Sequence, residues 1–202
     1  MDFSVVHLQR IFEIIRVTSV HRLNRYLKSD IVRAEAPEYE DDSERRLPYQ
    51  STILLWGPAA RISLHVQFDL QTAQLLAEQA SANTPLRGDQ TNIEALAKDF
   101  ISEFSNLHAG HLRSLFSRHQ LNFGLSLPLV KVVASKLPPQ TTTEGVYSVR
   151  WNLVCGANIL RCSADVDTRQ SYDLSSTAAS FEQALVSERA DVQSESGDIE
   201  FF

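Results

Sequence analysis

The sequence predicts an α+β domain in which an antiparallel-rich sheet packs against long helices. Strand-like segments in the last third of the chain follow one another without crossover helices, which argues against a purely parallel α/β fold. Two long segments, at the start and in the middle, carry apolar residues at helical spacing. With 202 residues, the chain is long enough for one domain with a sizeable core.

Before the central helix, we predict a long helix, three strands and a short helix. The helices cover roughly residues 4–28 and 70–80, and the strands cover residues 31–36, 51–56 and 61–68. The strand at 61–68 alternates apolar and polar residues, which is typical of a sheet with one buried face. Asp69 is expected to cap the short helix.

After the central helix, the sequence predicts strands only. Residues 121–134 form a strand that bends near Pro128, which indicates an edge position or a bulge. Residues 146–154 and 159–166 form a hairpin. A single domain over residues 1–167 accounts for all these elements. The acidic extension over residues 168–202 is expected to be partly helical or disordered.

The central helix is expected over about residues 92–116, where Thr91 and Glu94 form a capping box. Four of its residues fall at i, i+4, i+7 and i+11 and share an arc of roughly 60°. A separate apolar stripe, about 130° away, anchors the helix in the core. Its residues are Ile93, Leu96, Ala97, Phe100, Phe104, Leu107 and Leu115. The four residues are Asp99, Glu103, Asn106 and Gly110. A carboxylate and a carboxamide are thus presented on the solvent side of a rigid element.

The segment from Asp99 to Gly110 resembles the signature helix of the CheC/CheX/FliY chemotaxis phosphatases. In that family an Asp or Ser is followed by Glu after three residues, by Asn after two more, and later by a proline. Pro128 is the candidate proline here, one residue nearer than in the family pattern. The order of strand, short helix, signature helix and strand is also similar over residues 50–165. Because only one Glu-x-x-Asn motif is present, the chain looks most like the single-site CheX proteins.

The resemblance implies a CheC-like fold and hydrolysis of the aspartyl phosphate on a CheY-like response regulator, in chemotaxis or another two-component pathway. Because an acyl phosphate is already activated, its hydrolysis mainly requires a water placed in line with phosphorus. Asn106 has the donor and acceptor to orient that water, and Glu103 would pair with a lysine of the receiver. Asp99 would extend the docking face, and Gly110 would allow another backbone to approach.

The resemblance also implies a homodimer, with the phosphorylated receiver as partner. No cofactor of its own is expected, because any Mg²⁺ would belong to the receiver. Two alternatives remain open: a non-catalytic module that binds a receiver through the same helix, and a dimeric signalling or structural protein of the same fold.

Composition argues against other classes of function. A net charge of −6 and a pI near 5.5 do not suit nucleic-acid binding. No apolar stretch reaches the roughly 18 residues that a membrane span requires, and no secretory signal opens the chain, so we expect a cytoplasmic protein.

No residue set suggests a metal site. His108 and His111 are three residues apart but fall on or near the apolar stripe, so we interpret them as core or interface histidines. Cys155 and Cys162 match no zinc spacing and are expected to be free thiols.

Overall fold

The computed structural model describes residues 3–36, 47–57, 60–81, 93–133 and 144–168, together with residues 183, 186 and 190. Residues 37–46, which are rich in charged side chains, lie outside these residues, as do Thr91 of the capping box and nearly all of the acidic extension. Gln183, Val186 and Ala190 are helical and exposed.

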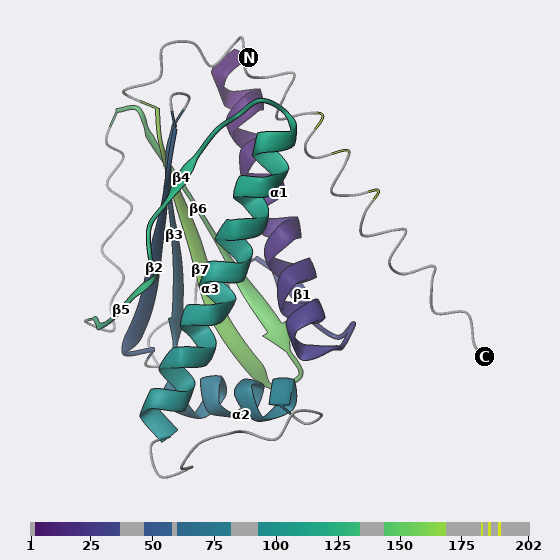
Figure 1. The fold of residues 1–202 in the computed structure, drawn as a ribbon, viewed down its shortest axis with the longest axis vertical. Helices are drawn as coiled ribbons and strands as arrows, with labels where there is room; N and C mark the ends of the chain where they lie inside the picture. The colour runs from purple at the N-terminus through teal and green to yellow at the C-terminus, as the bar shows by residue number, and fades with distance from the viewer. Residues whose placement is uncertain are drawn as a thin grey trace, which may run out of the picture.

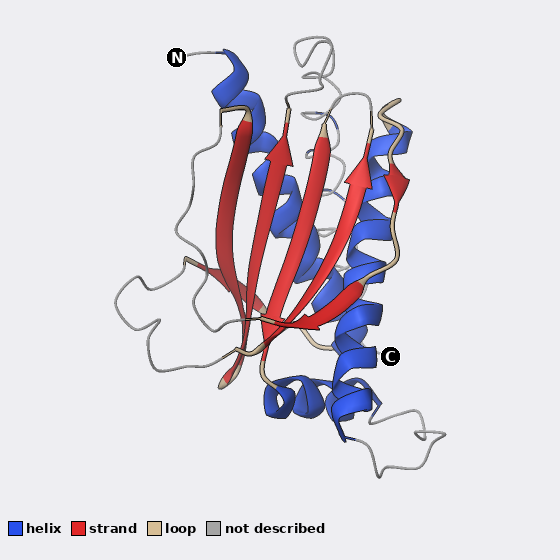
Figure 2. Cartoon of the chain, turned by 90° about the vertical axis from the view of Figure 1, so that its left-hand side faces the viewer, coloured by secondary structure: helices blue, strands red, loops and turns tan. Residues whose placement is uncertain are grey.

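The strands form one antiparallel seven-stranded sheet, which Figure 2 shows face on. Its order is β1-β6-β7-β3-β2-β4, and β5 also pairs with β2 beside β4. The strands are β1 (Arg33–Glu35), β2 (Tyr49–Trp56), β3 (Arg61–Phe68), β4 (Gly124–Leu125), β5 (Leu129–Val132), β6 (Val146–Cys155) and β7 (Asn158–Asp167).

Two long helices, α1 (Phe3–Leu27) and α3 (Ile93–Arg118), cover the same face of the sheet, and α2 (Leu70–Ser81) lies across one end of it. Figure 1 shows α3 over the β2 side and α1 over the β6 side. The antiparallel sheet with long helices on one face confirms the predicted α+β fold class.

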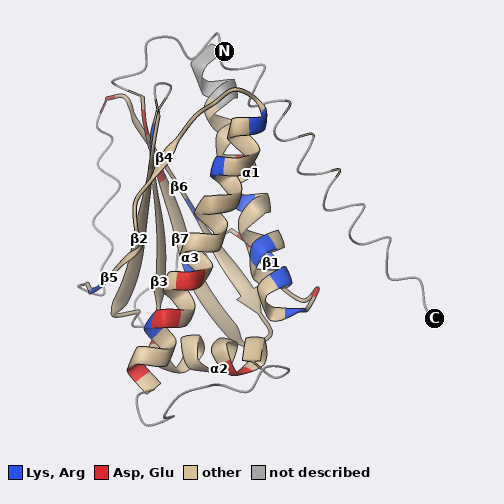
Figure 3. Ribbon diagram, in the orientation of Figure 1, with Lys and Arg blue, Asp and Glu red and all other residues tan. Residues whose placement is uncertain are grey.

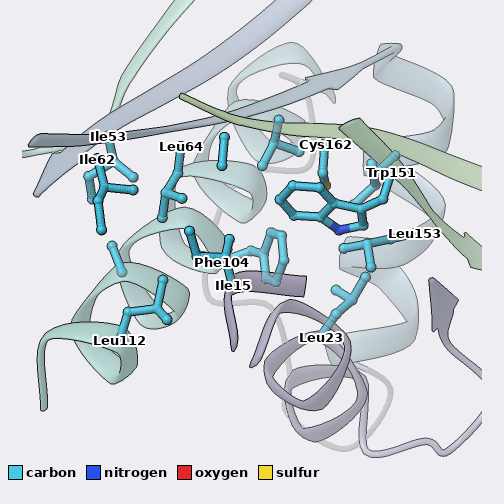
Figure 4. Close-up of a cluster of buried hydrophobic side chains, with 14 of the residues drawn as sticks. Ile15, Leu23, Ile53, Ile62, Leu64, Phe104, Leu112, Trp151, Leu153 and Cys162 are labelled. Atoms are coloured by element: carbon cyan, nitrogen blue, oxygen red, sulfur yellow. The ribbon is translucent and has the colours of Figure 1, made fainter. Parts of the chain in front are cut away.

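The core fills the space between the helices and the inner face of the sheet (Figure 4). Phe104 of α3 and Ile15 of α1 are fully buried there, opposite Ile62 of β3 and Leu153 of β6. Each central strand contributes alternate residues to this layer, as its burial pattern shows. Both cysteines are free and buried, and burial raises the pKa of the Cys162 thiol, so neither is a candidate nucleophile.

The segment around Pro128 confirms the predicted bend at a sheet edge. Residues 124–132 form two short strands that both pair with β2 on the outside of the sheet. Between them, the Ser126 hydroxyl accepts a hydrogen bond from the Leu54 amide at 3.0 Å, and the Ser126 amide donates to the Leu54 carbonyl at 2.9 Å. The side chain of Ser126 therefore keeps the chain attached to β2 where the ladder is interrupted.

The first strand is shorter than predicted. Residues 31–36 were expected to be extended, but only Arg33–Glu35 join the sheet. The Asn24 side chain of α1 accepts a hydrogen bond from the Val32 amide at 2.9 Å. Because Val32 is bound to the end of α1, it cannot pair with β6.

At the start of α2, the predicted cap is present. The Asp69 carboxylate accepts hydrogen bonds from the Thr72 amide at 2.7 Å and from the Thr72 hydroxyl at 2.9 Å. This cap fixes the start of α2, whose last turns lie beside the candidate site described next.

Candidate functional site

The outward face of α3 carries the four predicted residues. Asp99 and Glu103 are exposed, and Asn106 and Gly110 are half-buried. Figure 3 shows the acidic residues of α3 in its N-terminal half. The opposite face of the same helix is buried along its whole length. The helix is thus held by its apolar side and offers its polar side to the surroundings.

The buried face differs in part from the predicted apolar stripe. Ile93 and Leu107 were assigned to it but are 49% and 40% exposed, because neither the sheet nor α1 covers their side of the helix. Ser105 and His108 are buried instead. The Ser105 hydroxyl lies 2.9 Å from that of Ser51 on β2, which explains how a polar residue is accommodated there.

A groove of about 660 Å³ brings three of the four predicted residues together. Its lining from α3 includes Asp99, Glu103 and Asn106. The turn between β4 and β5 contributes Leu127 and Pro128. The end of α2 and one residue of α1 complete it, through Ala77, Ala80, Ser81 and Tyr26.

Pro128 therefore lies at the same groove as Glu103 and Asn106, although its distance along the chain is one residue shorter than in the family pattern. The preceding residue, Leu127, is 85% exposed and forms an apolar lip. A partner that enters the groove meets carboxylate and amide groups from the helix and apolar groups from the lip.

The polar groups of the site are not used within the described chain. Among the described residues, the side chains of Asp99, Glu103 and Asn106 make no hydrogen bond or ion pair. By contrast, Glu94 at the start of the same helix is bound to Lys98 at 2.5 Å, and this pairing lowers the pKa of Glu94. The lone pairs of Glu103 and the amide of Asn106 are consequently available to a ligand outside the protein.

Tyr26 is a site residue that sequence reasoning missed. It lies in the first predicted helix, and no motif marks it. In the structure its ring stacks on Phe100 with centroids 5.1 Å apart. Burial raises the pKa of Tyr26, and the negative charge of Glu103 raises it further, so the phenol stays neutral and lies near the carboxylate. Only the packing of α1 against α3 brings it there.

Gly110 is outside the groove lining but on the same face. A Cβ atom at this position would meet nothing within 4 Å. The free protein therefore gives no packing reason for a glycine here, whereas Gly124 has one, since a Cβ there would lie 2.4 Å from the Trp56 ring. A mid-helix glycine without an internal contact is consistent with the predicted close approach of a partner.

The two histidines join α1 to α3, which agrees with their interpretation as core or interface histidines. His108 is 3% exposed, and its Nε2 lies 3.0 Å from the Thr18 hydroxyl and 3.1 Å from the Ile15 carbonyl. Because a carbonyl only accepts, Nε2 carries the proton. His111 accepts a hydrogen bond from Arg22. Over the described ranges, no group of three His, Cys, Asp or Glu residues is arranged to hold a metal.

Comparison with known proteins gives a clear result for structure and none for sequence. No family model matches this sequence, and no curated protein matches it significantly. A CheC-like superfamily protein from Shewanella sp. PV-4 is similar in structure, with a TM-score of 0.58 at 13% identity, over 78% of this chain and 97% of that one.

Two CheX structures are also similar. One is the CheX–CheY complex with BeF₃ and Mg²⁺ from Borrelia burgdorferi, with a TM-score of 0.57 at 13% identity over 78% of this chain and 97% of that one. The other is CheX from Vibrio vulnificus, with a TM-score of 0.54 at 16% identity, over 74% of this chain and 97% of that one. The chain has the CheC-like fold, as the motif on the central helix predicted.

In the part of the chain that the structure describes, no helix has both the length and the apolar character to cross a membrane.

Proposed function

We propose that this protein is a phosphatase that hydrolyses the aspartyl phosphate of a CheY-like response regulator. One observation carries the proposal: Glu103 and Asn106 lie on one exposed helix face, at a groove that also holds Pro128, and neither has a partner within the described chain. The CheC-like fold supports it, since the Borrelia burgdorferi protein of this fold is bound to CheY.

In this mechanism α3 docks on the receiver beside its phosphorylated aspartate. Glu103 accepts hydrogen bonds from a lysine of the receiver and so draws it towards α3. The Asn106 carboxamide orients a water in line with the phosphorus. The water oxygen forms a bond to phosphorus as the bond to the aspartate oxygen breaks, which yields inorganic phosphate and a free carboxylate.

Asp99 and Gly110 act at the borders of this contact. Asp99 extends the polar face by one turn beyond Glu103. The bare surface at Gly110 admits the receiver backbone. We propose that Mg²⁺ is supplied by the receiver and that this protein needs no cofactor of its own. Together with the two free, buried thiols, such a partner suits a cytoplasmic location.

We further propose that the protein forms a homodimer through the β5 edge of the sheet. Leu129 is 64% exposed and Val132 is 70% exposed, on a strand that pairs with β2 alone among the described strands. An exposed apolar edge strand favours pairing with another chain. Sedimentation velocity should give a dimer for the parent and a monomer for Val132→Glu; a parent that is monomeric at high concentration would remove this proposal.

The phosphatase is tested by the loss of label from a phosphorylated CheY-type receiver. We expect the parent protein to accelerate this loss and Asn106→Ala to reduce the acceleration on the order of 100-fold. Gln71→Ala is the matched control, because it removes an exposed carboxamide from α2 outside the groove. An Asn106→Ala variant that is as active as the control would eliminate the assigned role.

A non-catalytic receiver-binding module is the second candidate. The apolar lip at Leu127, which is 85% exposed, favours it, since such a residue adds affinity without contributing to hydrolysis. Binding of the receiver by the parent without any acceleration of phosphate loss would select this candidate.

A further inference from the structure

The groove beside α3 has an apolar part that the proposed hydrolysis does not use. This apolar pocket lies where α1, α2 and the start of α3 meet (Figure 1). Its lining comes from all three helices and consists of Tyr26, Ala77, Ala80, Leu96 and Phe100. Asn106, which we assign to the water, lies six residues after Phe100, about 9 Å along the helix axis. A side chain that enters the apolar pocket is therefore separate from the phosphoryl group.

The walls of the apolar pocket are fixed in the free protein. The Tyr26 ring of α1 stacks on the Phe100 ring of α3, with centroids 5.1 Å apart and planes 8° from parallel. Phe100 is 4% exposed and Ala77 is 2% exposed, so both are held by the core. The α2 wall is lined by alanines, whose one-carbon side chains leave room in the pocket. A partner therefore meets a pocket that is already formed.

Two carboxylates stand at the rim of the apolar pocket. Asp99 and Glu103 lie one helical turn apart on α3, both are exposed, and both line the groove. Neither makes a hydrogen bond or ion pair with a described residue, and none of the described residues that line the groove is basic. Burial first, and the charge of Glu103 second, raise the pKa of Tyr26, so the field of the rim reaches the wall of the pocket. The groove therefore favours a partner that carries a positive charge beside an apolar group.

We propose that the apolar pocket and Asp99 bind a second site on the receiver, where an apolar side chain fills the pocket and a neighbouring lysine or arginine pairs with Asp99. Glu103, three residues before Asn106, stays assigned to the lysine beside the phosphorylated aspartate. Asp99 is seven residues before Asn106, about 10 Å along the axis, so the basic residue should lie about that far from the phosphorylated aspartate. The identity of the partner rests on the proposed function.

Such a contact decides which receiver binds. An apolar side chain that enters a preformed pocket adds affinity in proportion to the apolar area that it removes from water. An exposed ion pair adds less and is screened by salt, but the Asp99 carboxylate also repels a receiver that has an acidic residue at this place. The apolar pocket and Asp99 are thus specificity determinants at a distance from the reacting atoms.

The contact is tested by equilibrium binding of a receiver whose aspartate carries BeF₃ in place of the phosphoryl group, which requires no hydrolysis. Ala80→Phe fills the pocket and should weaken binding about tenfold. Asp99→Lys reverses the rim charge and should weaken it about fivefold, and only this loss should shrink at high salt. Leu75→Phe and Glu78→Lys are the matched controls, because both change exposed positions of α2 outside the groove lining.

Unchanged affinity in either Ala80→Phe or Asp99→Lys overturns the proposal. Thermal denaturation shows whether Ala80→Phe is folded, and Asp99→Lys changes an exposed side chain, so it keeps the test decisive if the first variant does not fold. If Ala80→Phe leaves receiver affinity unchanged but dissociates a dimer of this protein, a second copy fills the pocket, which also overturns the proposal.

A charge exchange identifies the receiver residue. Each exposed lysine or arginine about 10 Å from the phosphorylated aspartate is changed to glutamate in turn. One of these receivers should bind Asp99→Lys better than it binds the parent, and if none does, the proposed pairing is wrong.

The same experiments separate this inference from the proposed function. If the parent hydrolyses the phosphate and both variants bind the receiver as well as the parent does, the inference fails and the phosphatase stands. If both variants lose affinity but the parent does not accelerate hydrolysis, the phosphatase fails and the second site stands. A parent that binds no receiver removes both.

Discussion

Both faces of α3 carry polar residues, but only those on the inner face are hydrogen-bonded within the described chain. On the face toward the sheet and α1, Ser105 and His108 are buried and hydrogen-bonded, to Ser51 at 2.9 Å and to Thr18 at 3.0 Å. On the outward face, Glu103 and Asn106 make no hydrogen bond or ion pair with any described residue. The two faces lie on one rigid element, so the difference reflects what each face binds.

Buried polar groups must be paired within the protein, because an unpaired one costs about 1–3 kcal/mol. Exposed groups have no such requirement, since water satisfies them. The inner face therefore contributes to stability and the outer face to recognition, and substitutions on the two faces should affect different measurements.

The largest expected effect on stability belongs to His108. Replacing it with alanine removes a buried ring and its hydrogen bonds to α1, so we expect His108→Ala to lower the free energy of unfolding by about 2–4 kcal/mol. Asn106→Ala, on the other face, should stay within about 0.5 kcal/mol of the parent. Urea denaturation measures both, and equal losses in the two variants would contradict the division between the faces.

Ser105→Ala should have a smaller effect of the same sign. It leaves the buried Ser51 hydroxyl without the partner that it has at 2.9 Å, which costs about 1–2 kcal/mol. Replacing both serines with alanine should recover part of this loss, because no buried hydroxyl then remains unpaired. A double variant that is no more stable than Ser105→Ala would show that the hydrogen bond is not the reason for the loss.

Gly110→Ala should raise the stability of the protein and lower the rate of receiver dephosphorylation. The new methyl group meets nothing within 4 Å, so the helix should gain about 1 kcal/mol in stability. The same methyl group should hinder the receiver and slow dephosphorylation. If thermal denaturation shows the gain and the rate is unchanged, the partner does not approach this part of α3.

How far these faces could be predicted from the sequence depends on whether a feature follows from local spacing or from the packing of elements distant in the chain. The positions of Glu103 and Asn106 follow from helical spacing alone, and the hairpin of β6 and β7 from alternation and a short turn. Tyr26 could not be predicted as a site residue, because its role depends on how α1 crosses α3. The exposure of Leu107 has the same origin, since periodicity does not show which apolar residues a neighbouring helix leaves uncovered.

The smallest expected effect concerns Tyr26 and tests the geometry of the site itself. Burial is the main cause of its raised pKa, and the charge of Glu103 adds to it. Glu103→Gln should therefore lower the pKa of Tyr26 while leaving it above the ordinary value of 10.0. NMR titration of ¹³C-labelled tyrosine measures this; an unchanged pKa would place the carboxylate away from the phenol.

Single-turnover dephosphorylation at saturating protein tests the central claim most directly, because it separates binding from hydrolysis. We expect the parent to accelerate phosphate loss from the receiver. Asn106→Ala should bind the receiver as well as the parent does but no longer accelerate hydrolysis. Glu103→Ala should lose both the acceleration and affinity for the receiver. A parent that saturates the phosphorylated receiver without accelerating its hydrolysis would contradict the account and leave α3 a binding surface alone.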